Sequence, residues 1–296
     1  SLHDALPISI LKGSQIKSEK DLRPLSILPV LSKVYERLIF RQLSVFINKN
    51  NVLNNNISAN RKGQSTTNVL QAIRDDIVKA MKRSEVTMMI LADFSKAFDT
   101  ICFTNLTTKM SKLGFPRDFL IWTLNYITHR KQFVQIDDTC SEVKNVNFGV
   151  PQGPILDPVL FNIYVAYLHE IVNFKCFQYA DDTKIYDHAK ISDLNNCRNT
   201  ISQSINKLSA WSKQSTLAFN NDKTKVMILS TPQMSRVHHL DEYDPNIVVS
   251  GYKLERIKSC KLLGVHINEH LKWDDHIKHT VSECYVTLSI DRKSVV

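Results

Sequence analysis

Apolar residues recur every three or four positions in five stretches of the chain, which is the spacing of a helix with one buried face. The stretches span residues 31–39, 69–81, 106–113, 119–128 and 191–213. Ser65 precedes the second stretch as a candidate helix cap, and Gly114 follows the third, where helices commonly end. A longer apolar run from Val159 to Val172 predicts a buried helix.

Other apolar runs have the length of strands. They lie at residues 86–92, 133–136, 143–148, 177–180, 183–186 and 226–229. The first is apolar throughout, as in a strand buried on both faces, and the second and third alternate like the arms of a hairpin. The fourth and fifth predict another hairpin around Asp181 and Asp182. Strands mixed with unequal helices predict the α+β class.

Composition permits a sizeable core in one large domain or two smaller ones, because 43% of the 296 residues are hydrophobic. Lys and Arg number 38 against 29 Asp and Glu, and the formal charge of +9 favours polyanionic partners, although a basic enzyme of another kind also fits. The six cysteines are scattered, which indicates a reducing, intracellular setting. No apolar run reaches the roughly 18 residues of a membrane span, so we expect no membrane partner.

Histidines in the last third of the chain match zinc patterns weakly. His266, Glu269 and His270 fit H-x-x-E-H, and His276 and His279 lie three residues apart. Such short matches arise often by chance, so we interpret these histidines as surface or helix-face residues.

Carboxylates at predicted strand ends carry the strongest chemical signal. Asp93 directly follows the apolar strand, and Asp181 and Asp182 occupy the predicted hairpin turn. Carboxylates at the ends of neighbouring strands can converge, and oxygen ligands are what Mg²⁺ requires. Two such ions support phosphoryl transfer by activating an attacking hydroxyl and stabilising a leaving oxygen. Taken singly, Asp181 and Asp182 also fit a solvated turn, and Asp93 also fits a helix cap. The motifs around them therefore decide whether these aspartates form a metal site.

Seven motifs occur in a fixed order around these aspartates. They are Arg23-Pro24-Leu25-Ser26 to Leu38, Arg61 to Thr66, Asp93 to Asp99, Gly149-Val150-Pro151-Gln152-Gly153, Tyr179-Ala180-Asp181-Asp182, Trp211 to Thr224, and Leu263-Gly264-Val265. In this order the chain resembles the reverse transcriptase of a non-LTR (LINE-type) retrotransposon over nearly all of residues 20–277. The resemblance implies the fingers and palm of a right-hand polymerase, with an antiparallel palm sheet, packed helices and most of the thumb missing.

The resemblance also implies catalytic and primer-binding roles for single residues. Asp93, Asp181 and Asp182 would bind the two metal ions, with Asp93 and Asp181 as the ligands proper. Lys223 would protonate the leaving pyrophosphate, which requires a tuned pKa. Leu263, Gly264 and Val265 would form the primer grip; without the resemblance they fit an ordinary buried turn.

Further residues would contact nucleotide or template. They are Arg23, Arg61, Phe98, Gln152, Gly153 and Tyr179. Phe98 matches the aromatic that crowds the sugar 2′ position and excludes ribonucleotides, although a core phenylalanine is the alternative. The two arginines match phosphate-binding positions or are solvated surface charges. Gln152 and Gly153 lie where the family places a side-chain amide and a glycine backbone close to the nucleotide or template.

One loop departs from the family. Where Gly-Ser-x-Leu-Gly-Pro is usual, this chain has Gly153-Pro154-Ile155-Leu156-Asp157-Pro158. Pro154 removes a backbone donor, and Asp157 replaces a glycine that we expect to need positive φ and adds negative charge near a triphosphate. Such drift is typical of a decaying element copy.

The two ends are expected not to belong to the element. Codons can be chosen for His3 to Ile8 whose reverse complement translates as Asp291 to Val296, so we hypothesise adaptor read-through at residues 1–8 and 291–296. Amplifying the source locus tests this, and genomic sequence encoding both ends would refute it. Between them we expect fingers at 9–85, palm with inserted fingers elements at 86–235, and the primer-grip region with the start of the thumb at 236–290.

The primary expectation is an RNA-directed DNA polymerase that extends a DNA primer on an RNA template. It would use deoxynucleoside triphosphates and two Mg²⁺ ions, with Mn²⁺ as the alternative. The rival is a truncated, catalytically inactive remnant that only binds nucleic acid. An RNA-templated RNA polymerase shares the metal chemistry, but Phe98 argues against it. The resemblance implies the nucleus or cytoplasm of a eukaryotic host and leaves the oligomeric state open.

Overall fold

The computed structural model describes residues 6–11, 22–59, 61, 63–133, 135–136, 139–172 and 174–293. The chain divides into two compact units, each built from three segments. The first unit takes in residues 1–60, 94–170 and 210–219, and the second takes in residues 61–93, 171–209 and 220–296. Residues 1–5 and 294–296, which belong to the hypothesised adaptor, lie outside the described residues.

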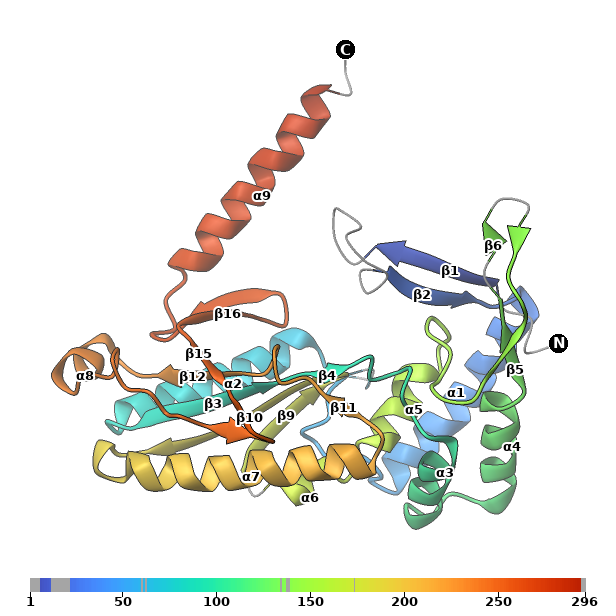
Figure 1. Cartoon of the computed structure of the whole chain (residues 1–296), viewed down its shortest axis with the longest axis horizontal. Helices are drawn as coiled ribbons and strands as arrows, with labels where there is room; N and C mark the ends of the chain where they lie inside the picture. Colours follow the sequence, from blue (N-terminus) through green and yellow to red (C-terminus); the bar gives the residue numbers. More distant parts are fainter. Residues whose placement is uncertain are drawn as a thin grey trace. The chain divides into compact units, whose positions relative to one another are not determined.

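The second unit contains the main sheet (Figure 1). Its described strands run in the order β15–β12–β3–β10–β9, with β12 and β15 parallel and the other neighbours antiparallel. Their bounds are β3 (Val86–Ala92), β9 (Lys175–Tyr179), β10 (Asp182–Ala189), β12 (Lys225–Leu229) and β15 (Glu255–Ile257). All seven residues of β3 are buried, as its continuous apolar sequence predicts for a central strand covered on both faces.

Helices cover both faces of this sheet. Along β3, Met89 faces α2 (Thr66–Lys82), whereas Met88 and Ile90 point to the opposite face, where α7 (Leu194–Gln214) lies in Figure 1. On the α2 side, one face of the helix packs against residues of β3, β10 and β12 and against Leu262 of the later hairpin. The residues of this core are Val69, Ile73, Ile77, Met89, Leu91, Tyr186, Met227, Leu229 and Leu262.

The start of α2 follows the predicted capping pattern. Ser65 has extended backbone, and its Oγ accepts a hydrogen bond from the Asn68 N–H at 3.2 Å. The prediction of a capped helix is therefore confirmed.

A polar network joins α2 to the sheet. Asp76 on α2 accepts hydrogen bonds from Lys175 Nζ at 2.6 Å and from Tyr186 Oη at 3.0 Å. His188 Nε2 lies 3.2 Å from the same carboxylate, and its Nδ1 lies 2.8 Å from Thr87 Oγ1. Burial opposes ionisation of Asp76, but the hydrogen bonds from Lys175, His188 and Tyr186 outweigh it and hold its pKa below the ordinary value.

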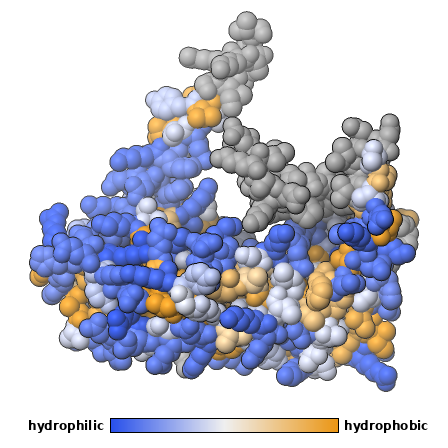
Figure 2. Space-filling model, viewed as in Figure 1, coloured by the Kyte–Doolittle hydropathy of each residue, from blue (hydrophilic) through white to orange (hydrophobic). Residues whose placement is uncertain are grey.

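A hairpin and a helix complete the second unit. β16 (Ser259–Leu262) and β17 (Val265–Asn268) pair antiparallel, and α9 (Asp274–Lys293) follows. Shorter elements precede them: η2 (Ile191–Asp193), α8 (Pro232–Val237), β13 (Val248–Val249) and β14 (Tyr252–Lys253). None of the described helices is both long and apolar enough to cross a membrane. On the face drawn in Figure 2, hydrophilic residues prevail and hydrophobic ones form smaller patches.

The residues of the zinc-like pattern have separate partners. Glu269 pairs with Arg256, whose Nη2 lies 3.4 Å from Oε2, and His270 Nδ1 lies 2.9 Å from the Ser230 carbonyl oxygen. His266 instead stacks on His279 of α9, with ring centroids 4.2 Å apart.

The first unit consists mainly of helices with short strand pairs. The helices are α1 (Val30–Lys49), α3 (Phe103–Lys112), α4 (Arg117–Ile127), α5 (Asp157–Tyr164) and α6 (Leu168–Ile171), the last ending at the boundary of the unit. The strand pairs are β1 (Leu6–Leu11) with β2 (Leu22–Ile27), β4 (Phe94–Ser95) with β11 (Ala218–Phe219), β5 (Arg130–Gln132) with β8 (Lys144–Val146), and β6 (Gln135–Ile136) with β7 (Thr139–Cys140). The last two pairs lie in the region of the predicted hairpin, but the predicted arms at 133–136 and 143–148 do not pair with each other. Gln135–Ile136 pairs with Thr139–Cys140, and Lys144–Val146 pairs with Arg130–Gln132.

The prediction of one buried helix from Val159 to Val172 is wrong, because α5 ends at Tyr164 and α6 starts at Leu168. Lys109 explains the break. Its Nζ donates to the Tyr164 carbonyl oxygen at 2.7 Å, and the Leu168 N–H bonds to Val165 instead. A long-range hydrogen bond therefore replaces the helical one.

Candidate active site

The register of two strands brings two of the predicted carboxylates together. β3 and β10 pair Ala92 with Thr183, and one further step along the same register places Asp93 opposite Asp182. Directly opposed residues of antiparallel neighbours have Cα atoms about 4.5–5.5 Å apart. Segments distant in sequence thus deliver two carboxylates to one end of the sheet.

The third predicted carboxylate, Asp181, lies in the turn between β9 and β10. Tyr179 pairs with Asp182, which leaves Ala180 and Asp181 as a two-residue turn. Ala180 has φ +54°, a left-handed conformation that is costly for a residue with a Cβ. Asp181 is partly buried, and Tyr179 packs against the core beneath α2.

A loop after β11 holds Asp93 in place. The Asn220 N–H donates to the Asp93 carbonyl oxygen at 2.9 Å, and Asn220 Nδ2 donates to Asp93 Oδ2 at 3.0 Å. The Asp93 N–H donates to Thr224 Oγ1 at 3.3 Å. Asn220 Oδ1 in turn accepts from the Lys223 N–H at 3.2 Å. The loop thus fixes one carboxylate oxygen and leaves Asp93 Oδ1 without a protein donor among the hydrogen bonds of the described residues.

The charges around Asp93 oppose one another. Burial raises the pKa of the Asp93 carboxyl, the charge of Lys223 and the hydrogen bond from Asn220 lower it, and the charge of Asp182 raises it again. The net effect is a raised pKa, and burial is its largest cause. Lys223 is exposed but close enough for its charge to act on Asp93.

Two residues of this site were missed by sequence reasoning. Lys184 is 7% exposed and donates from Nζ to Asp182 Oδ1 at 3.1 Å. Asn220 orients Asp93, as described above. A lysine two residues along a strand from Asp182 must share its face, which was the available signal for Lys184. For Asn220, the polar sequence of residues 220–224 is typical of a loop, but only the fold shows that Asn220 contacts Asp93.

The donor set fits a hard divalent cation in its chemistry. Carboxylate oxygens are the preferred ligands, and opposed like charges on neighbouring strands are unfavourable until a cation separates them. Within the described ranges, no three His, Cys, Asp or Glu side chains are already grouped as ligands of a metal ion. Asp182 is paired with Lys184 instead, so ligation requires Asp182 to exchange or share that partner.

Other predicted site residues lie in the first unit. The Phe98 ring packs on Phe161 with centroids 4.7 Å apart. Gln152 Nε2 donates to Asp99 Oδ1 at 2.6 Å, and the Gln152 carbonyl oxygen accepts from the Ser26 N–H at 2.6 Å. Gly153 has φ +115°, and a Cβ there would meet the Ser26 carbonyl oxygen at 3.0 Å. This position therefore requires glycine.

The two predicted arginines are separated by the division into units. Arg61 is partly buried in the second unit. Arg23 belongs to β2 in the first unit, and its side chain lies outside the described residues.

The expectation that Asp157 takes a positive φ is wrong. Asp157 begins α5 with ordinary helical backbone, and its side chain is 2% exposed. Burial, followed by the charge of Glu36, raises its pKa well above the ordinary value, and the charge of Arg130 opposes this. Neither carboxylate oxygen has a hydrogen-bond partner of good geometry among the described residues, although the Gly153 backbone N–H lies close enough to lower the pKa. The side chain of Asp157 thus lies in the interior of the first unit.

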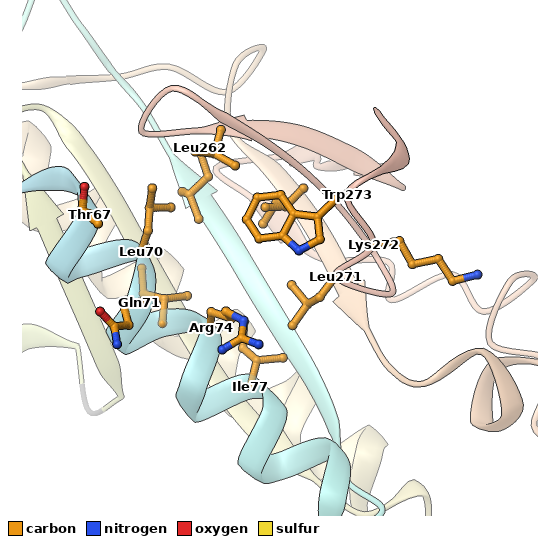
Figure 3. A pocket seen from close by; sticks show the side chains of 12 residues that line it. Thr67, Leu70, Gln71, Arg74, Ile77, Leu262, Leu271, Lys272 and Trp273 are labelled. Carbon is orange, nitrogen blue, oxygen red and sulfur yellow. The ribbon is translucent and has the colours of Figure 1, made fainter. Parts of the chain in front are cut away.

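The predicted primer-grip residues form the tip of the β16–β17 hairpin. Leu263 and Gly264 make the turn with φ +47° and +92°, and Val265 starts β17. A cavity of about 270 Å³ lies between this hairpin and α2 (Figure 3). It is lined mainly by apolar side chains, including Leu70, Val265 and Trp273. The hairpin is therefore incompletely packed against the helix.

Comparison with known proteins places the chain in a family. A family model described as "Reverse transcriptase (RNA-dependent DNA polymerase)" matches residues 10–267. The chain is 26% identical to the probable RNA-directed DNA polymerase from transposon BS of Drosophila melanogaster, over 96% of the chain and 32% of that protein. It is 23% identical to the RNA-directed DNA polymerase from mobile element jockey of the same species, over 91% of the chain and 29% of that protein. The chain thus spans about a third of the length of these curated relatives.

Solved structures of telomerase have a fold similar to that of this chain. Telomerase from Candida albicans, in complex with a TWJ fragment of telomeric RNA, aligns with a TM-score of 0.55 at 14% identity, over 90% of the chain and 46% of that protein. Apo telomerase from Candida tropicalis, truncated from its C-terminal domain, aligns with a TM-score of 0.54 at 15% identity, over 86% and 52%. The prediction of an α+β fold with polymerase fingers and palm is confirmed. The chain belongs to the reverse transcriptase (RNA-dependent DNA polymerase) family, and it is a reverse transcriptase domain of the non-LTR, LINE type.

Proposed function

We propose that this domain is an RNA-directed DNA polymerase that extends the 3′-hydroxyl of a DNA primer on an RNA template. The observation that carries the proposal is the β3–β10 register, which sets Asp93 opposite Asp182 beside the Asp181 turn. Family membership supplies the reaction class, and the paired carboxylates supply the chemistry that class needs.

Asp93, Asp181 and Asp182 are the proposed ligands of two divalent ions, Mg²⁺ or alternatively Mn²⁺. When bound, such ions lower the pKa of the attacking hydroxyl and neutralise charge on the leaving pyrophosphate. The hydrogen bond from Asn220 Nδ2 holds Asp93 Oδ2, so Oδ1 is the oxygen offered to the cation. Lys223, whose charge acts on Asp93, is the proposed general acid for pyrophosphate.

The remaining assignments concern substrate. We assign Phe98 to exclusion of the sugar 2′-hydroxyl, and Gln152, Gly153 and Tyr179 to the nucleotide and template. Arg23 and Arg61 are assigned to phosphates, and the Leu263–Val265 turn to the primer. The proposed fingers cover residues 9–85, the palm 86–235, and the primer-grip region 236–290. Nucleic-acid substrate and eukaryotic relatives favour the nucleus or cytoplasm of the host cell.

Nucleotide choice tests the proposal. With poly(rA)/oligo(dT) and Mg²⁺, we expect incorporation of dTTP and discrimination against UTP. Phe98→Ala should raise the use of UTP relative to dTTP by at least about ten-fold, because removing the ring opens space for a 2′-hydroxyl. A ten-fold change corresponds to a loss of about 1.4 kcal/mol of discrimination between the two nucleotides. Phe115→Ala, a buried phenylalanine of the same unit outside the proposed site, is the control and should leave the ratio unchanged.

Two outcomes would contradict the proposed DNA polymerase activity. Equal use of UTP and dTTP by the wild type would contradict a deoxynucleotide polymerase. Absence of incorporation with either nucleotide at saturating template would favour the inactive remnant that only binds nucleic acid.

A further inference from the structure

Lys184 is a buried cation inside a site that is defined by its carboxylates. It lies on β10 opposite Leu91, and the strand alternation puts it on the same face as Asp182 and Tyr186. Its side chain is 9% exposed, whereas that of Asp182 is 52% exposed. The ammonium group lies 3.1 Å from Asp182 Oδ1. The Lys184 side chain is therefore largely covered by protein, and its ammonium group contacts the more exposed carboxylate of Asp182.

The charge of Lys184 acts on both opposed carboxylates. It pairs directly with Asp182, and it also favours the ionised form of Asp93, against the larger effect of burial. A buried ammonium without a counter-charge is unfavourable, so Asp182 is the partner that makes the burial of Lys184 acceptable. Lys223 acts more strongly than Lys184 on Asp93, but it is exposed, and among the ion pairs of the described residues Asp182 is paired with Lys184.

We propose that Lys184 is the resident counter-ion of the carboxylate site and competes with the divalent cation for Asp182. The inference rests on the proposed function, because it takes Asp93, Asp181 and Asp182 as the metal ligands. Without metal, Lys184 offsets the repulsion between Asp182 and Asp93. With metal, the cation must take Asp182 from Lys184 or share it. Lys184 thereby sets the metal affinity of the site.

Removing the charge should therefore tighten metal binding. Lys184→Met keeps the length and the apolar stem but lacks the ammonium group. We expect its apparent Kd for Mn²⁺, measured by electron paramagnetic resonance on the full chain, to fall about five-fold, as for loss of a partly exposed competing ion pair. The rise in Tm on adding Mn²⁺ should be larger in this variant than in the wild type, because tighter binding stabilises the folded state more.

Two matched variants separate a local charge effect from a structural one. Lys184→Arg restores the positive charge and should return the Mn²⁺ affinity toward the wild-type value. Lys253→Met makes the same change at an ion pair with Asp244, away from these carboxylates, and should leave the affinity unchanged. Unchanged or weaker Mn²⁺ binding by Lys184→Met, measured on protein with wild-type circular dichroism, would overturn the inference.

Asp93→Asn distinguishes failure of this inference from failure of the proposed function. If Asp93→Asn abolishes Mn²⁺ binding and Lys184→Met does not tighten it, the site stands and the role of Lys184 is refuted. If Asp93→Asn binds Mn²⁺ like the wild type, the carboxylate site itself is refuted, and the inference is refuted with it.

Discussion

At the scale of single residues, Asp157 shows how a substitution can persist in a fold at a cost to stability. Its carboxylate is buried next to Glu36, and burial outweighs the opposing effects of Arg130 and the Gly153 backbone N–H, so its neutral form is favoured in the folded state. The family usually has glycine here, which carries no charge into the interior. The departure therefore affects folding stability first.

Asp157→Ala is expected to stabilise the protein. Because the pKa of Asp157 is raised in the folded state, its contribution is most favourable below the ordinary value of 3.8 and is lost as pH rises through the folded pKa. The variant should gain about 1–3 kcal/mol in the free energy of unfolding at pH 8, and less at pH 4. Urea denaturation at both pH values measures this.

The control for Asp157→Ala is Asp118→Ala, which removes an exposed aspartate from the first turn of α4. It should lose a few tenths of a kcal/mol through the helix dipole and show no gain at high pH. A loss of stability at pH 8 in Asp157→Ala would mean that the carboxylate has a favourable partner after all.

Single residues of the site were predictable to different degrees. Asp93, Asp181 and Asp182 could be named because their motifs recur in a fixed order. Lys184 could have been found from its two-residue spacing from Asp182 on a strand, whereas Asn220 could not, because its contact with Asp93 forms across more than 100 residues. The same reason explains Asp157, whose burial beside Glu36 has no local sequence signal.

At the scale of elements, α2 depends on the sheet for more than apolar packing. Asp76 receives hydrogen bonds from Lys175 and Tyr186 and contacts His188 on two neighbouring strands. Charge-assisted hydrogen bonds of this kind are stronger than neutral ones. The network therefore fixes the position of α2 along the sheet.

Asp76→Asn is expected to destabilise the protein by about 1–3 kcal/mol at pH 7. The pKa of Asp76 is lowered in the folded state, so this stability is present above the ordinary value of 3.8 and is lost as pH falls through the folded pKa. The difference between variant and wild type should therefore shrink toward pH 3 in chemical denaturation. Asp75→Asn, a partly exposed neighbour paired with Arg74, should change stability by about 0.5 kcal/mol or less. Equal losses in both variants would contradict a specific role of Asp76.

The hairpin β16–β17 should respond to filling of the cavity beside α2. Val265→Ile adds one methylene toward the space of about 270 Å³, and burying it is worth about 0.8 kcal/mol. Hydrogen exchange of the β16–β17 amides should slow by a few-fold. Val248→Ile on the exposed β13 is the control. Faster exchange in Val265→Ile would show that the site is already fully packed.

Elements were predicted well where their apolar pattern is local. The helices around residues 69–81 and 191–213 and the strand at 86–92 follow their periodicity closely. The break between α5 and α6 was not predictable, because it depends on Lys109 from another helix. Short strands such as β13 and β14 were missed because two residues carry no periodic pattern.

At the scale of the whole chain, discontinuous segments build each unit. The proposed carboxylate site lies within the second unit, since Asp93, the Ala180–Lys184 segment and the Asn220–Thr224 loop all belong to it. The family and fold could be predicted because the order of motifs survives even when identity to relatives is 26% or less. The division into units could not, because it depends on contacts among segments far apart in sequence.

The most direct test of the proposed catalytic site measures single-nucleotide incorporation. At saturating poly(rA)/oligo(dT), dTTP and Mg²⁺, we compare the wild type with Asp93→Asn, Asp182→Asn and the exposed control Asp193→Asn. We predict that both site variants slow incorporation by about 10³-fold or more, and that the control matches the wild type. Incorporation by Asp93→Asn or Asp182→Asn at the wild-type rate would contradict a catalytic site formed where β3 meets β10.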